Sequence, residues 1–188
     1  MRRILFIFMI EFEAFIEQLL GGYRSSYDIE KVNNPEDELY ATAHMHMEQY
    51  QKLLFKEFKT SQSDADEYVY FYRTPHLTAK KAQELIQRSY DDGFPRIKLE
   101  HVTFRHQHMC TRLVAIVICD EADEEALKVI KKSKIYKSFQ FSLKGWMEVH
   151  TAVLELGTGE VVGNSYGRET AKFMKKHVEH YLKQHVDK

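Results

Sequence analysis

Hydrophobic residues in the first third of the chain recur every three or four positions, a spacing typical of amphipathic helices. The first predicted helix ends at the glycine pair Gly21-Gly22. The second begins at Pro35 behind the capping residue Asn34. Its apolar positions are Leu39, Ala43, Met47, Tyr50, Leu54 and Phe58. Together these helices predict an N-terminal helical layer over residues 1–66.

The rest of the chain, residues 67–188, alternates between strand-like and helix-like patterns. In order, we predict a strand over 67–73, a helix over 78–90 that Thr78 can cap, strands over 97–106 and 111–119, a helix over 122–133, and a strand through Phe139, Phe141 and Leu143. The helix over 122–133 is acidic at its start and basic at its end, which matches the helix dipole. A hairpin about Gly157-Thr158-Gly159 then joins 146–156 to 160–165, and a last helix begins near Arg168. The first six elements have the order βαββαβ. The predicted fold class is therefore α+β: a ferredoxin-like core with an added C-terminal hairpin and helix, on which the N-terminal helical layer packs to give one compact domain.

The composition describes an ordinary globular protein with a nearly neutral charge. The 188 residues are 44% hydrophobic and carry a net charge of −1, so bulk charge does not indicate nucleic-acid binding. Cys110 and Cys119 bracket one predicted strand and would lie roughly 30 Å apart, far beyond the reach of a disulfide. Free thiols favour a reducing cytoplasm. The apolar run Ile4–Ile10 is too short for a transmembrane segment, and glutamates follow it closely.

Histidines gather at the end of one predicted strand, where His106 and His108 alternate and therefore point to the same face. Alternate strand residues lie about 6.6 Å apart, which lets both imidazoles reach one ion. A third ligand from His76, His150 or Glu148 would complete a site for zinc or another divalent metal, with one coordination position left open. The sequence thus predicts His106 and His108 as its best metal-ligand pair.

Other histidine patterns give the hydrolase alternatives. His44-Met45-His46 lies in the predicted second helix, where side chains two positions apart diverge, so no shared metal is expected there. The triplets His76-Leu77-Thr78 and His101-Val102-Thr103 are similar, over six residues, to the paired His-apolar-Thr triplets of 2H-type phosphoesterases. His106-Gln107-His108, with Tyr181 on the last helix, resembles the plan of His-hydrophobic-His endonucleases, although Gln107 departs from the hydrophobic middle position.

No phosphate-binding glycine loop or nucleophile elbow accompanies these residues. A sheet with helices on one face would leave aromatic side chains on the other, and Tyr70, Tyr72 and Phe104 are the predicted ligand contacts. We therefore expect a cytoplasmic, non-catalytic binding or regulatory module that acts through a protein or small ligand. It would need no cofactor. Either the N-terminal helices or the last helix would cover the open sheet face, or a homodimer would seal it. The alternative is a metal- or histidine-dependent phosphoester hydrolase or nuclease that uses His106 and His108.

Overall fold

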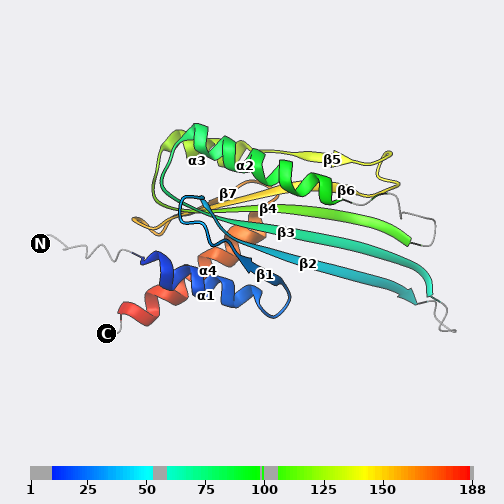
Figure 1. Ribbon diagram of the computed structural model, residues 1–188, viewed down its shortest axis with the longest axis horizontal. Helices are drawn as coiled ribbons and strands as arrows, with labels where there is room; N and C mark the ends of the chain where they lie inside the picture. The colour runs from blue at the N-terminus through cyan, green and yellow to red at the C-terminus, as the bar shows by residue number, and fades with distance from the viewer. Residues whose placement is uncertain (1–9, 53–58, 98, 100–105, 187–188) are drawn as a thin grey trace, which may run out of the picture.

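The computed structural model describes residues 10–52, 59–97, 99 and 106–186, which form three layers around a central β-sheet (Figure 1). Within these residues the chain has seven strands and four α-helices. Helices α2 (Ala79–Gly93) and α3 (Glu124–Lys132) pack on one face of the sheet, and α1 (Phe12–Tyr23) and α4 (Arg168–Val186) pack on the other. The fold is therefore mixed α+β, as the sequence predicts.

The strands follow the order β1-β2-β3-β4-β6-β5, and β7 pairs with β6 outside this path. Their bounds are β1 Asp28–Lys31, β2 Leu39–Lys52, β3 Lys59–Leu77, β4 His106–Ala122, β5 Tyr136–Ser138, β6 Trp146–Glu155 and β7 Val161–Gly163. Strands β3, β4 and β6 run parallel, whereas the other neighbouring pairs are antiparallel. Parallel neighbours need long crossovers, which α2 and α3 supply on one face of the sheet.

Each face of the sheet buries its own apolar core because side chains alternate along every strand. The core beneath α1 and α4 includes Phe15, Leu19, Phe71, Ile116 and Leu154. The core beneath α2 and α3 includes Tyr72, Leu85, Leu113, Ile130 and Val153. The strands β2, β3 and β4 continue past the end of α1 and α4, so the sheet is longer than the helical layer that covers it (Figure 1).

The predicted second helix is wrong, because Leu39–Lys52 forms β2 and pairs with β3 in antiparallel register. Between Ala41 and Met47 every second residue is apolar, and the residues between them are polar, which is the period of a half-buried strand. The same stretch contains Ala, Met, Glu and Gln, which favour helices, and cross-strand pairing overrides that preference. The layer that packs on this face instead combines α1 with α4 from the far end of the chain.

The ferredoxin-like arrangement is not confirmed. Residues His106–Ala122 form one strand, and the remainder of the predicted strand 97–106 lies almost entirely outside the described residues. Three parallel strands lie next to one another, and the seven-stranded sheet exceeds a simple ferredoxin fold. The strand predicted through Phe139 and Leu143 is also wrong, because β5 ends at Ser138 and a turn follows.

Several local predictions are confirmed. Thr78 caps α2, since its hydroxyl accepts a hydrogen bond from the backbone N–H of Lys81 at 3.2 Å. Helix α3 is acidic in its first turn and basic in its last, which complements the helix dipole. Strands β6 and β7 form the expected hairpin, and α4 begins at Arg168. The predicted end of the first helix at Gly21-Gly22 is not confirmed, because α1 runs through this glycine pair and ends at Tyr23.

Candidate ligand-binding cavity

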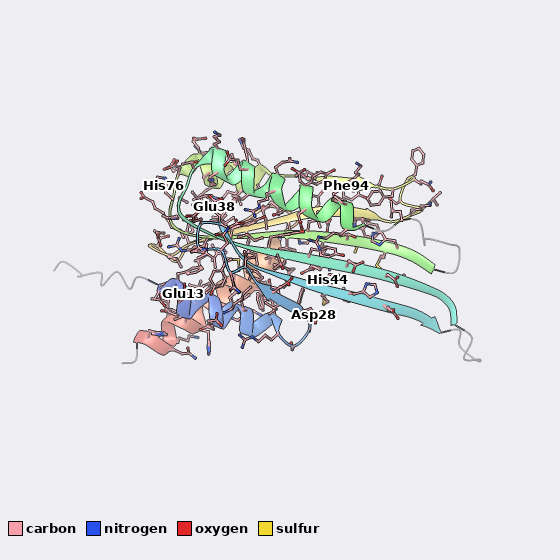
Figure 2. All side chains as sticks on the ribbon, in the orientation of Figure 1. Glu13, Asp28, Glu38, His44, His76 and Phe94 are labelled. Atoms are coloured by element: carbon pink, nitrogen blue, oxygen red, sulfur yellow. The ribbon has the colours of Figure 1, made fainter. Side chains whose placement is uncertain are left out.

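A cavity of about 490 Å³ lies beside the edge strand β1, between the sheet and the C-terminal end of α2. It is lined by Asp28, Ile29, Glu30, Thr42, Ala43, His44, Tyr68, Val69, Tyr70, Asp92 and Arg96. Its volume falls in the range of small-ligand sites, which are concave and carry a few converging polar groups. Figure 2 shows His44 on the long strand β2, Asp28 on the neighbouring strand β1, and Phe94 at the end of α2.

Strand register brings the polar side chains of the cavity to one face. Asp28 pairs with His44 across β1 and β2, and His44 pairs with Tyr68 across β2 and β3. Two residues further along β1, Glu30 pairs with Thr42 of β2, which in turn pairs with Tyr70 of β3. Because the side-chain period in a strand is two, each row places its side chains on the same side of the sheet. The cavity is therefore built by register rather than by any local sequence motif.

An aromatic stack forms one wall of the cavity. The ring centroids of His44 and Tyr68 lie 4.3 Å apart and their planes differ by only 4°. The guanidinium of Arg96 lies 5.7 Å from the centroid of the Tyr68 ring. Burial and the nearby Asp66 raise the pKa of the Tyr68 hydroxyl, so this ring stays neutral at ordinary pH. The stack gives the cavity a flat, preorganised surface.

Asp92, near the end of α2, anchors the part of the wall that adjoins this stack, because Arg96 contacts both Asp92 and Tyr68. The Tyr70 hydroxyl donates a hydrogen bond of 2.7 Å to Asp92 Oδ2. Arg96 Nε donates to the same oxygen at 3.0 Å, and its terminal nitrogen donates to Asp92 Oδ1 at 3.2 Å. Burial raises the pKa of Tyr70, which keeps its hydroxyl a donor. A carboxylate at a helix C-terminus opposes the helix dipole, and the bidentate guanidinium offsets that cost.

The mouth of the cavity carries uncompensated negative charge. Asp28 and Glu30 are exposed on β1, and within the described part of the chain neither side chain makes an ion pair or hydrogen bond. Asp92 is already neutralised by Arg96. The two carboxylates on β1 therefore give the cavity a net negative charge that a ligand can balance.

A histidine–carboxylate cluster continues from the cavity along β2 and β3. His44 Nε2 and His46 Nδ1 both donate to Asp66 Oδ1, at 2.9 and 3.0 Å. The hydrogen bond that His46 donates to Asp66 raises the pKa of His46. The sequence pattern did not indicate this cluster, because its helical spacing predicted both histidines in a helix. The alternation of residues 41–47 was the signal that could have placed them on one face of a strand.

Of the predicted metal pair, the structure describes the side chain of His108 alone. The side chain of His106 lies outside the described residues, whereas His108 is 8% exposed and its Nε2 lies 3.2 Å from the Thr111 hydroxyl. Burial lowers the pKa of His108, so its ring is neutral at ordinary pH. Among the side chains that the structure describes, no three His, Cys, Asp or Glu residues are placed to hold a metal. Metal binding by His106 and His108 stays a prediction that elemental analysis of the purified protein tests.

The three predicted ligand contacts have different surroundings. Tyr70 lines the cavity. Tyr72 is 1% exposed beneath α2, where its hydroxyl and that of Ser89 lie 2.9 Å apart, so it does not reach the cavity. Phe104 lies outside the described residues. Aromatic content thus pointed to β3, but only strand register separates the side chain that faces the cavity from the one in the core.

The remaining histidine and cysteine candidates lie away from the cavity. His76 Nε2 donates to Asp123 at 2.8 Å, and His150 Nε2 donates to Glu148 at 2.8 Å on β6. The second phosphoesterase-like triplet, His101-Val102-Thr103, lies outside the described residues. Both cysteines are free and buried, and burial raises their thiol pKa values, that of Cys119 to about 12. These thiols are therefore protonated and are poor nucleophiles.

Fold and cavity together define a class: a three-layer α+β protein with a ligand-sized cavity at one edge of its sheet. The chain belongs to the family described as "Domain of unknown function (DUF8052)", whose model matches residues 11–176. The matched range contains every residue that lines the cavity. No curated protein and no solved structure matches the chain.

Proposed function

We propose that this protein is a non-catalytic binding or regulatory module that holds a small organic cation in the cavity beside β1. The observation that carries the proposal is the combination of a ligand-sized cavity with two carboxylates, Asp28 and Glu30, that make no ion pair or hydrogen bond within the described residues. A protonated amine or amidine on a flat or apolar body fits this chemistry. Its charge would meet the carboxylates, and its body would lie against the tyrosine-lined wall.

The wall opposite these carboxylates supports binding because it is already ordered. Tyr70, Asp92 and Arg96 hold one another through three hydrogen bonds, and His44 stacks on Tyr68. A ligand would therefore not have to order these side chains, whose immobilisation otherwise costs about 0.5–1.5 kcal/mol each. Preorganisation of this kind favours recognition of one ligand shape.

The proposal is tested by a thermal-shift screen of small amines and amidines against matched neutral analogues. At a ligand concentration of about a hundred times Kd, mass action stabilises the folded state by about 2.7 kcal/mol, which raises Tm by about 5 to 10 °C for a domain of this size. The double variant Asp28→Asn with Glu30→Gln is expected to lose this shift. The control Glu121→Gln with Glu160→Gln changes the net charge equally at exposed positions outside the cavity.

Two outcomes would contradict the proposal. In the first, no cation raises Tm more than its neutral analogue does. In the second, the cavity variant and the control variant lose the shift equally, which would assign the effect to bulk charge.

A further inference from the structure

The turn between β5 and β6, residues Phe139–Gly145, presents large apolar side chains to solvent. Phe141 is 97% exposed and Leu143 is 77% exposed, and Tyr136 on β5 is 48% exposed. Most large apolar side chains elsewhere in the described chain lie in the two cores. Clustered exposure of this kind marks a contact surface rather than a folding requirement.

The backbone of this turn is strained, and its conformation holds the apolar side chains of the tip toward solvent. Gln140, Phe141 and Ser142 have φ angles of 48°, 55° and 67°, a region that non-glycine residues rarely adopt. Hydrogen bonds within the turn hold this conformation: Phe139 N–H donates to Gly145 O at 2.9 Å, and Lys144 N–H donates to Phe139 O at 3.1 Å. A backbone held away from its preferred region at an exposed tip is a common feature of binding sites.

The sequence segment that carries the tip is rich in lysine. Between 131 and 146 the chain has five lysines and no acidic residue: Lys131, Lys132, Lys134, Lys137 and Lys144. Within the described residues none of the five forms an ion pair with a carboxylate, and Lys137 instead lies 4.3 Å from the centroid of the Phe94 ring. Trp146, the single tryptophan of the chain, follows directly and is half-buried.

We propose that this basic, aromatic segment, residues 131–146, docks the protein onto an anionic lipid surface, with Phe141 and Leu143 inserted into the interface. Charge complementarity selects the partner: unpaired lysines attract anionic headgroups, while exposed apolar tips enter the boundary between headgroups and acyl chains. A second copy offering the same segment would bring like charges together. No helix among the described residues has the length and apolarity to span a bilayer.

The test uses the full chain and sealed vesicles of phosphatidylcholine, with and without phosphatidylserine. Sedimentation measures binding, and Trp146 fluorescence reports insertion beside the tip. We expect binding, a blue shift and reduced iodide quenching only with phosphatidylserine, and all three should weaken as salt is added. Phe141→Asn removes the ring and suits the left-handed backbone, so the fold should persist while vesicle affinity falls about tenfold or more.

A charge-matched pair of variants separates the segment from bulk charge. Lys134→Gln with Lys144→Gln should weaken vesicle binding, whereas Lys175→Gln with Lys176→Gln, on the exposed side of α4, should leave it unchanged. Equal loss in both double variants would overturn the proposal, as would absence of binding at low salt. Concentration-dependent self-association without lipid that Phe141→Asn abolishes would also overturn it, because the segment would then be an interface between copies.

Discussion

The buried side chain of Asn164, which follows β7, is hydrogen-bonded to three other parts of the fold. Its replacement by aspartate tests how much this junction contributes to stability. Asn164 is 3% exposed. Its Oδ1 accepts hydrogen bonds from Thr151 N–H at 3.1 Å and Gly167 N–H at 2.6 Å. Its Nδ2 donates to Ser133 O at 3.1 Å and Val149 O at 2.9 Å. Nδ2 thus donates both of its hydrogens and Oδ1 accepts two bonds, so the amide is fully hydrogen-bonded. Its partners belong to β6, the end of α3 and the start of α4.

Asn164→Asp keeps the acceptor and replaces the donor. The two backbone carbonyls would lose their hydrogen bonds and face a second carboxylate oxygen. Each buried group left without a partner costs about 1–3 kcal/mol, so we expect a loss of about 3 to 5 kcal/mol at neutral pH, or about 10 °C in Tm. The control Asn34→Asp makes the same chemical change at an exposed residue whose Oδ1 accepts a bond from Glu36 N–H, and it should change stability by less than about 0.5 kcal/mol.

The stability difference between Asn164→Asp and the wild type should also change with pH in a defined direction. Burial beside two carbonyls should raise the folded-state pKa of the new carboxyl above its unfolded value, because only the protonated form can donate to a carbonyl. A raised pKa contributes stability below the unfolded pKa and loses it as pH rises through the folded pKa. The gap between Asn164→Asp and wild type in urea unfolding, followed by circular dichroism, should therefore widen from acid to neutral pH. An effect no larger than that of Asn34→Asp, or a gap that narrows with rising pH, would refute the reasoning.

Three further predictions concern other parts of the molecule. His46→Gln should destabilise the protein at about pH 5 but not at about pH 8, because a histidine whose pKa is raised by Asp66 adds stability only while its ring is protonated. The midpoints of urea unfolding at both pH values test this. Asp37→Asn should lower the free energy of unfolding by about 1 kcal/mol at neutral pH, because the two-point contact with Arg88 lowers the pKa of Asp37 to about 2. The loss should be smaller in high salt because Arg88 is 42% exposed, and equal losses at both salt levels would argue against an ion pair. Gly145→Ala should lower the free energy of unfolding by about 3 kcal/mol, because this residue has a φ of 79° and a Cβ would lie 2.4 Å from a backbone oxygen of β4. A calorimetric Tm equal to that of the wild type would contradict the described turn.

The sequence predicted the elements whose signals are local. The helix that begins behind Thr78, the polar ends of α3 and the hairpin of β6 and β7 follow from caps, charge order and turn glycines. Strand β2 was mistaken for a helix because Leu39, Ala43 and Met47 also fit a helical spacing. The choice depended on pairing with β3, an interaction between distant segments that propensity does not encode.

The cavity was hidden from the sequence for the same reason. Tyr70 was predicted as a ligand contact from the aromatic character of its strand. Asp28, Glu30 and Asp92 belong to no motif, and they converge only because β1 pairs with β2 and α2 ends above β3. His44 was set aside for being in a supposed helix, although it lines the cavity. Charged residues scattered along the chain acquire a shared role only once the register is known.

The central claim is that the cavity beside β1 binds an organic cation, and residue-specific NMR titration tests it most directly. With the best amine or amidine from the thermal-shift screen, we expect saturable amide shifts in Asp28–Glu30, Thr42–His44, Tyr68–Tyr70 and Asp92–Arg96, absent with the neutral analogue and in Asp28→Asn with Glu30→Gln. Shifts confined to other surfaces, or equal shifts with the neutral analogue, would contradict the account.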